Sequence, residues 1–404
     1  MPDADDPGAA ATDRARSKVR QRLGLAVLTL IVVAVAVGGV LIATREPPPP
    51  PPKPDIPLDA WAPYWTLDAS IPEADRRLGS LRDVSPFWFS AVGVNEIVVD
   101  PSASPELTEE FLDKARSSTA NVVPSIVDAM PAGGMAAILA DPATRAQHVE
   151  AIAAFASDGD YAGIDIDYEQ FAFADGRETW ASTRPNWVAF ITELGAALHA
   201  DGRTLSVSIP PVYDAGQTLD SGYWVYDYGG IAPHVDTIRI MAYDFSVDEA
   251  GPIAPLAWVE STITGAIEAV GSPDKLVLGI PAYGRNWPTF VSGTCPADAE
   301  GRTSLTTLTV DDLIARRSAT PVYVEETGEW FFEYNLEVTD GVTTCTQTRQ
   351  VHYVDGNGVR ARMDLARQYQ LNGVSLWALG FDDEGVWDAI LPTVTDPSAT
   401  TTVL

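Results

Sequence analysis

The chain has 404 residues, of which 46% are hydrophobic, so it is long enough to form one large barrel with additional segments. Its 56 acidic and 26 basic residues give a formal net charge of −30 at pH 7. Because such a surface repels phosphates, the composition argues against nucleic acid as a partner and against docking on anionic lipid head groups.

The first predicted element is a membrane anchor at residues 23–43, a stretch of 21 residues without a charge. As a helix it would span about 30 Å, the thickness of the hydrocarbon core of a lipid bilayer. Basic residues crowd the segment before it, which predicts that residues 1–22 form a cytoplasmic N-terminal tail and that the rest is extracellular. We therefore predict a single-pass protein of the cell membrane. A cleaved signal peptide is the alternative, although its apolar region is usually shorter.

A linker is predicted at residues 44–57, because six consecutive prolines occupy positions 47–52. A proline run adopts the extended polyproline II conformation and acts as a stiff spacer. Residues 393–404 are rich in threonine and are predicted to be a C-terminal tail.

Residues 58–392 have the pattern of a (β/α)8 TIM barrel, an α/β fold. Short apolar runs alternate with helical stretches, as in parallel β/α units, and eight such units close a barrel. An open doubly wound sheet is the alternative, but no glycine-rich phosphate loop follows any run. The predicted strands are 59–66, 84–92, 122–127, 163–169, 205–210, 237–244, 276–283 and 373–379, and predicted helices include 144–157, 187–200, 259–270 and 359–371.

The interval between the seventh and eighth strands is about 90 residues long, too long for one helix. Strand-like alternation at 322–324, 330–334 and 336–338 predicts a small β-rich insertion at about residues 286–350. Cys295 and Cys345, the two cysteines of the chain, flank these strand-like runs. In an oxidising compartment we expect them to form a disulfide. The four histidines are scattered, so we predict no metal and no cofactor.

The fourth predicted strand contains acidic residues at alternate positions, Asp165, Asp167 and Glu169, separated by Ile164, Ile166 and Tyr168. Residues two apart in a strand share a face, so the carboxyls should enter the barrel. Glu169 ends the predicted strand, at the mouth where TIM-barrel chemistry takes place. Neighbouring carboxyls cannot all ionise, so at least one pKa should rise and supply a proton donor near neutral pH. Glycosidic cleavage requires such a donor.

This run resembles the signature of family-18 glycoside hydrolases, Asp-x-x-Asp-x-Asp-x-Glu on strand four, with Ala162 in place of the first Asp. Residues 241–244 resemble the strand-six motif Met-x-Tyr-Asp, and residues 373–380 resemble strand eight. The resemblance covers about residues 58–390. The Ser-x-Gly-Gly of strand three is missing, since Pro-Ser-Ile-Val stands at 124–127, which is typical of a divergent bacterial branch similar to spore-cortex-type N-acetylglucosaminidases.

The resemblance implies hydrolysis of β-linked N-acetylglucosamine-containing glycans, either peptidoglycan or chitin-like polymers, with the acetamido oxygen of the substrate as the nucleophile and retention of configuration. It implies that Glu169 is the acid and then the base, that Asp167 orients the acetamido group, and that Asp165 shares a proton or charge with Asp167. Tyr243 would donate to the acetamido oxygen, and Trp377 would lie beneath the sugar. The other predicted substrate-binding residues are Met241, Asp244, Tyr64 with its neighbour Trp65, and Tyr283.

Two other functions remain open at this point. A barrel of the same fold could bind carbohydrate without cleaving it, although Glu169, Asp167 and Tyr243 are all present. A glycosidase acting on sugars without an N-acetyl group would need a separate carboxylate nucleophile, and none stands out in the sequence.

Overall fold

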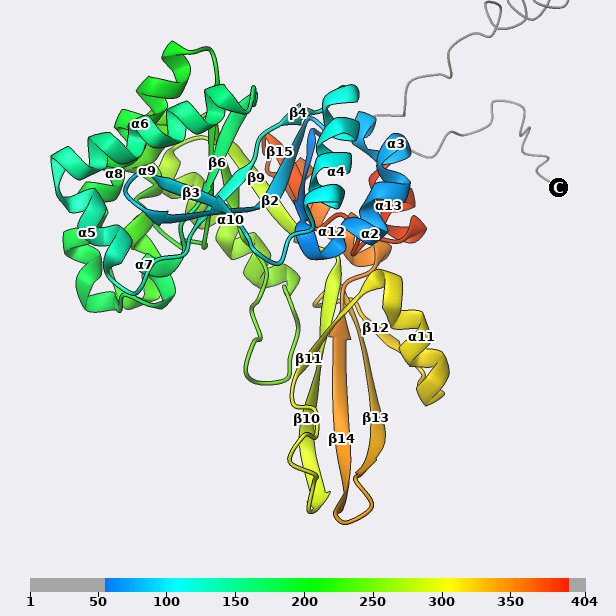
Figure 1. Ribbon diagram of the computed structural model, residues 1–404. Helices are drawn as coiled ribbons and strands as arrows, with labels where there is room; N and C mark the ends of the chain where they lie inside the picture. The colour runs from blue at the N-terminus through cyan, green and yellow to red at the C-terminus, as the bar shows by residue number, and fades with distance from the viewer. Residues whose placement is uncertain (1–54, 392–404) are drawn as a thin grey trace, which may run out of the picture. The chain divides into compact units, whose positions relative to one another are not determined.

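Eight parallel strands close into a barrel within residues 55–391, the part of the chain that the computed structural model describes (Figure 1). The strands follow the hydrogen-bonded order β1-β15-β9-β8-β7-β6-β5-β2, and β2 pairs back with β1, so the ring is closed and the open-sheet alternative is wrong. The eight are β1 (Leu58–Pro63), β2 (Asp83–Gly93), β5 (Ser125–Asp128), β6 (Gly163–Asp167), β7 (Thr204–Ile209), β8 (Thr237–Ile240), β9 (Leu276–Pro281) and β15 (Gly373–Trp377).

Helices fill the intervals between the barrel strands, as the sequence predicted. Two further strands join β2: β4 (Asn121–Val122), which is parallel to it, and β3 (Glu96–Val99), which is antiparallel. The helices of the barrel are α2 (Leu67–Ser70), α3 (Ala74–Arg77), α4 (Pro105–Ser117), α5 (Gly134–Ala140), α6 (Pro142–Asp158), α7 (Gln170–Phe173), α8 (Trp180–Ala200), α9 (Tyr228–Ile231), α10 (Leu256–Val270), α12 (Gly356–Gln368) and α13 (Glu384–Ile390).

The predicted anchor at 23–43, its flank at 1–22, most of the linker at 44–57 and the tail at 393–404 lie outside the described residues. Between Asp55 and Leu391, no helix combines the length and the apolar character that a bilayer crossing needs. The membrane anchor therefore stays a prediction from the sequence.

Several barrel strands end earlier than predicted, and their last predicted residues begin loops or other elements. β6 ends at Asp167 because the backbone N–H of Glu169 donates to the Asp128 side chain (2.9 Å) rather than to a neighbouring strand. β8 ends at Ile240, and Asp244 adopts a left-handed conformation with φ 61°. β9 ends at Pro281, and Tyr283 already belongs to the next sheet.

The barrel interior contains a polar cluster instead of purely aliphatic layers. Asp165 is fully buried and accepts hydrogen bonds from Ser206 (2.5 Å), Ser125 (2.6 Å) and Ser208 (2.9 Å). These serines come from the two strands beside β6, where Ser125 and Ser206 lie opposite Asp165 in the register. Arg239, also fully buried, lies 3.3 Å from Asp165 and 3.5 Å from Asp59. The cluster therefore keeps a buried carboxylate paired with a cation.

We expect Arg239→Met to lower the free energy of unfolding by about 3–5 kcal/mol, because it leaves buried carboxylates without a compensating charge. Urea denaturation followed by circular dichroism measures this. Arg367→Met is the matched control, since the Arg367–Asp55 pair is partly exposed, with side chains 33% and 62% accessible, and should change stability by at most about 1 kcal/mol. Equal losses in the two variants would contradict the prediction.

The insertion between β9 and β15 is a five-stranded antiparallel sheet with one helix, somewhat longer than predicted. Its strand order is β11-β10-β14-β13-β12, and its helix covers a small apolar core that includes Phe332 and Val351. Its elements are β10 (Tyr283–Gly293), β11 (Thr303–Thr306), α11 (Thr307–Arg317), β12 (Val322–Val324), β13 (Glu329–Thr339) and β14 (Thr344–Tyr353). Figure 1 shows the long strands extending away from the barrel.

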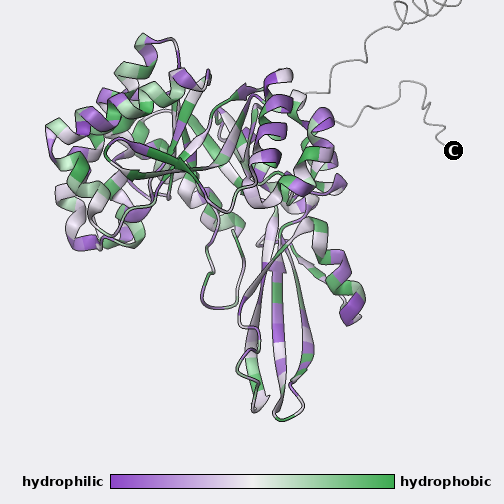
Figure 2. Cartoon of the chain, in the orientation of Figure 1, coloured by the Kyte–Doolittle hydropathy of each residue, from purple (hydrophilic) through white to green (hydrophobic). Residues whose placement is uncertain are grey.

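The predicted disulfide is confirmed, because Cys295 and Cys345 are bonded to each other. The bond joins the segment after β10 to the beginning of β14. Hydrophilic and hydrophobic residues alternate along the strands of the insertion in Figure 2, as expected for a sheet with one covered face.

Candidate active site

Two adjoining cavities meet at Glu169, at the carboxyl ends of the barrel strands. One has a volume of about 540 Å³ and is lined by Trp377, Asp167 and residues of the insertion such as Leu305. The other, of about 460 Å³, is lined by Tyr223, Phe245 and Trp258. Glu169 lines both cavities, and so do the residues of the strand-six motif other than the buried Ala242, namely Met241, Tyr243 and Asp244. The predicted motifs therefore converge on one cleft, with Glu169 between its two halves.

Asp167 lies in the first cavity and has unusual surroundings. Its side chain is 3% exposed, and its Oδ1 atom has no hydrogen-bond partner in the described structure. Burial raises the pKa of Asp167 well above its ordinary value, and the charges of Glu169 and Asp165 act in the same direction. An unsatisfied buried carboxyl is costly, so this group is placed for a partner that the protein itself does not supply.

Glu169 combines access to both cavities with a raised pKa. It follows β6 and precedes α7, with backbone angles φ −104° and ψ −11°. Burial raises the pKa of Glu169 to about 7, and the negative charge of Asp244 contributes. A carboxyl that keeps its proton near neutral pH at a cleft can act as a general acid.

Aromatic side chains, among them Trp377 and Tyr243, line the first cavity. Trp377 ends β15, and its ring lies 5.0 Å from Phe87, 5.7 Å from Trp61 and 6.4 Å from Tyr243. These contacts hold the indole at the mouth of the barrel. Burial raises the pKa of Tyr243 well above its ordinary value, so its phenol stays protonated and can donate a hydrogen bond.

Asp244 is held by two neighbours from the first strand of the insertion. The Tyr283 hydroxyl donates to its carboxylate, and Arg285 forms an ion pair with it at 2.7 Å. The same Arg285 donates to the Ser246 carbonyl, so the loop after β8 is fastened to the insertion. Asp244 is thus an ion-paired carboxylate, in contrast to Asp167.

The structure brings most of the predicted residues together, with two differences. Tyr64 is not among the residues that line the two cavities; it packs edge-on against Trp65, which does line the first. Asp165 accepts hydrogen bonds from serines and Trp61 and pairs with Arg239, and no hydrogen bond between it and Asp167 is formed. Of the expected sharing of a proton or charge with Asp167, the structure therefore shows only the electrostatic influence of Asp165.

The sequence reasoning missed Asp128 and Arg239. Asp128 directly follows the third predicted strand, a position at the catalytic end of the barrel. Arg239 lies between two isoleucines of β8, which is the alternating pattern that identified the carboxylates of β6. Asp128 could have been found from its position at the end of a strand, and Arg239 by applying the alternation rule to basic residues as well.

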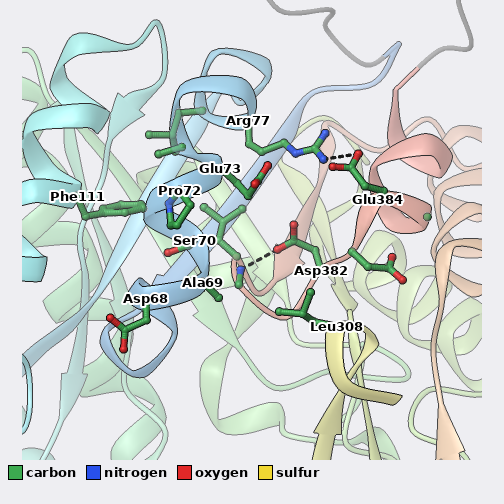
Figure 3. A pocket seen from close by; sticks show the side chains of 16 residues that line it. Asp68, Ala69, Ser70, Pro72, Glu73, Arg77, Phe111, Leu308, Asp382 and Glu384 are labelled. Carbon is green, nitrogen blue, oxygen red and sulfur yellow. Dashed lines mark hydrogen bonds and ion pairs between the residues drawn. The ribbon is translucent and has the colours of Figure 1, made fainter. Parts of the chain in front are cut away.

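Two other observations delimit the site. Between Asp55 and Leu391, no group of three histidine, cysteine or acidic side chains is arranged to hold a metal ion. A separate cavity of about 490 Å³, shown in Figure 3, is lined by Arg77, Asp382 and Glu384. Arg77 pairs with Glu384 at 2.8 Å, and Asp382 accepts from the Gly380 N–H at 2.8 Å. These contacts fix the loop after β15, and none of the predicted catalytic residues lines this cavity.

Comparison with known proteins agrees with this geometry. The model of the glycosyl hydrolases family 18 matches residues 83–382. The chain belongs to this family. It is therefore a glycoside hydrolase, in a family for which substrate-assisted catalysis with retention is typical.

Relatives and solved structures resemble the chain over most of its length. YdhD of Bacillus subtilis (strain 168), named as a sporulation-specific glycosylase, is 28% identical over 332 residues, covering 78% of this chain and 71% of the relative. A chitinase of Chromobacterium violaceum is 25% identical, covers 83% of this chain and 98% of that one, and superposes with a TM-score of 0.68. The spore cortex-lytic enzyme SleL of Bacillus megaterium, at 17% identity and covering 86% of this chain and 76% of that one, shares the fold with a TM-score of 0.67.

Proposed function

We propose that this glycoside hydrolase cleaves β-linked N-acetylglucosamine-containing glycans, with the acetamido group of the substrate as the nucleophile. The observation that carries the proposal is the state of the carboxyls in the cleft. Asp244 is engaged by Arg285 and Tyr283. Of the carboxyl groups that line the first cavity, this leaves Asp167 and Glu169, which belong to the same acidic motif. A two-carboxylate mechanism needs its second group across the scissile bond, and the lining residues of the two cavities provide no unpaired one there.

In the proposed reaction, Glu169 protonates the leaving glycosidic oxygen while the acetamido oxygen attacks the anomeric carbon. The C–O bond to the leaving group breaks, and a cyclic oxazolinium intermediate forms. Asp167, beneath the sugar, accepts a hydrogen bond from the acetamido N–H as positive charge develops, which supplies the partner that its Oδ1 lacks. The ionised Glu169 then takes a proton from a water molecule whose oxygen attacks the anomeric carbon. The bond between that carbon and the acetamido oxygen breaks, the acetamido group is restored, and two displacements at one carbon retain the configuration.

The remaining residues bind and orient the sugar. Tyr243 donates its hydroxyl hydrogen to the acetamido oxygen, and the indole of Trp377 lies under the ring. Met241, Asp244 and Tyr283 line the cavity around them. Asp165 acts through its charge: the negative charge of Asp165 raises the pKa of Asp167, and the positive charge of Arg239 lowers it.

The substrate that we propose first is peptidoglycan, with chitin-like polymers as the second class. The support comes from the predicted stalk outside a membrane and from the likeness to YdhD and SleL. Parallel digestion of purified glycan strands and chitin oligomers, with mass analysis of products, tests this. Release of fragments ending in N-acetylglucosamine is expected, and failure to cleave either polymer or a chromogenic N-acetylglucosaminide would refute it.

We propose further that residues 23–43 anchor the enzyme in the cell membrane with the catalytic barrel outside. The uncharged run, the basic flank and the proline-rich spacer support this, and a disulfide suits an oxidising compartment. Full-length protein should remain in the membrane pellet after carbonate extraction and should be cleaved by protease added to intact cells. Recovery in the soluble fraction would refute the anchor.

Activity is expected to fall as the pH rises through about 7, because Glu169 must carry its proton in the first step and burial raises the pKa of Glu169 to about that value. The sign follows from the raised pKa: the acid form predominates below 7 and is lost above it. The pH dependence of kcat/KM on a chromogenic N-acetylglucosaminide measures this. A profile that stays flat up to pH 9 would contradict the assignment of Glu169 as the acid.

A further inference from the structure

Asp128 contacts the backbone of the proposed general acid directly, and the proposed reaction gives it no role. It is the last residue of β5, the strand that pairs with β6. Its Oδ1 atom accepts the N–H of Glu169 at 2.9 Å, and its Oδ2 atom lies 3.3 Å from the N–H of Gln170. The side chain is 6% exposed.

These contacts fix where the chain leaves the barrel. The register pairs Val127 with Asp167, so the two strands run side by side up to the residues just before Asp128 and Glu169. Beyond that point, the N–H groups that a longer β6 would offer to β5 go to the Asp128 carboxylate instead. The Gln170 side chain donates back to the Asp128 carbonyl at 3.4 Å. The turn that presents Glu169 to both cavities is therefore held from one side by a single carboxylate.

Asp128 also adds a negative charge to the acidic group. Burial raises the pKa of Asp128 to about 7. The hydrogen bonds from the backbone of Glu169 and Gln170 lower this pKa, and the charge of Glu169 raises it. Those N–H donors stabilise the anion of Asp128. Because the repulsion between two carboxylates is mutual, an ionised Asp128 favours the protonated form of Glu169. The other titratable or charged groups facing this pair are Asp167 of β6, Tyr168 after β6, Arg239 of β8, Tyr243 and Asp244 after β8, Tyr223 and Tyr226 after β7, and Tyr283 and Arg285 of β10.

We propose that Asp128 is a positioning residue for the general acid: its carboxyl group holds the backbone of Glu169 in the turn at the mouth of the barrel, and its charge is coupled to that of Glu169. This inference rests on the proposed role of Glu169. It assigns two separable effects to one side chain, a geometric one that is independent of pH and an electrostatic one that is not.

The two effects are separated by two substitutions. Asp128→Asn keeps an oxygen that can accept from the Glu169 N–H but removes the charge, so the pKa of Glu169 should fall. The alkaline limb of kcat/KM should then move to lower pH by about one unit, with kcat at pH 5.5 reduced less than about 10-fold. Asp128→Ala removes the acceptor as well, so kcat should fall by about 10²-fold at every pH while KM changes little.

Asp141→Asn is the matched control. Asp141 holds two backbone N–H groups at the start of α6, those of Ala143 and Thr144, but it is exposed and outside both cavities. Loss of an ordinary helix cap lowers stability without changing a pH profile. An alkaline limb that moves in Asp128→Asn and not in Asp141→Asn supports the proposal. Superimposable limbs in wild type and Asp128→Asn would overturn it.

A second readout does not depend on the substrate. In protein labelled with ¹³C at glutamate carboxyls, the Glu169 resonance is the one missing from the Glu169→Gln spectrum, and its titration gives the pKa directly. A lower pKa in Asp128→Asn is expected, and an unchanged one would overturn the electrostatic part even if the enzyme acts on another glycan. If the wild type cleaved no N-acetylglucosaminide while the titration shifted as expected, the proposed function would fail and the Asp128–Glu169 coupling would stand.

Discussion

Replacing Glu169 with glutamine is expected to lower kcat by about 10²–10⁴-fold or more, since the reaction loses its general acid and base. Glutamine has the same shape and cannot give up a proton to the leaving oxygen. Burial already keeps the Glu169 carboxyl protonated near pH 7, so the neutral amide should disturb the fold little. Steady-state rates on a chromogenic N-acetylglucosaminide, with circular dichroism to verify folding, measure the effect.

Glu150→Gln is the control for this experiment, because Glu150 is an exposed residue of α6 away from both cavities. It should keep full activity. A folded Glu169→Gln enzyme that retained more than half of the wild-type rate would remove Glu169 from the mechanism and would require another residue to act as the acid.

Asp167→Asn should reduce kcat by about 10²-fold or more, because an amide cannot ionise to stabilise the developing oxazolinium ion. The effect should be specific to chemistry: an asparagine fits the same space, and KM should change less than kcat. A chromogenic substrate with a good leaving group, which needs little protonation, separates the two carboxyls. Such a substrate should rescue Glu169→Gln in part and leave Asp167→Asn impaired.

The nucleophile itself is tested by the substrate. If the acetamido group attacks, the matching glucoside, which lacks that group, should be inert, and a thiazoline mimic of the intermediate should inhibit strongly. Proton NMR of the first product should show retained configuration. Inversion, or efficient cleavage of the plain glucoside, would refute the mechanism and require a second carboxylate such as Asp244 to be freed from Arg285.

The loop that carries Asp244 illustrates how the insertion contributes to the site. Arg285 and Tyr283 belong to its first strand, and they bind Asp244 and the neighbouring backbone. Glu329, at the start of β13, accepts the N–H groups of Ile253 and Ala254 at 2.8 and 2.7 Å. The insertion therefore fastens both ends of the loop after β8 and limits the shape of the cleft on that side.

By itself, the sequence determined the barrel, the order of its strands and the acidic strand at its centre. These follow from local patterns: apolar runs of strand length, helices between them, and alternation of Asp165, Asp167 and Glu169 with apolar residues. The cysteine pair was also predictable, since two cysteines in one predicted excursion permit a single bond. Within a contiguous motif, the relative directions of the side chains follow from the secondary structure of that segment.

Only the tertiary structure decided how those carboxyls differ. Asp165 becomes a paired anion because Arg239 and three serines arrive from other strands, and Asp167 remains without a hydrogen-bond partner for its Oδ1 because none arrives. Strand β6 ends before Glu169 because the side chain of Asp128, 41 residues earlier in the chain, accepts a hydrogen bond from the Glu169 N–H. Burial and hydrogen-bond partners depend on residues distant in sequence, so the protonation state of each acid is set by the closed barrel and not by the local pattern.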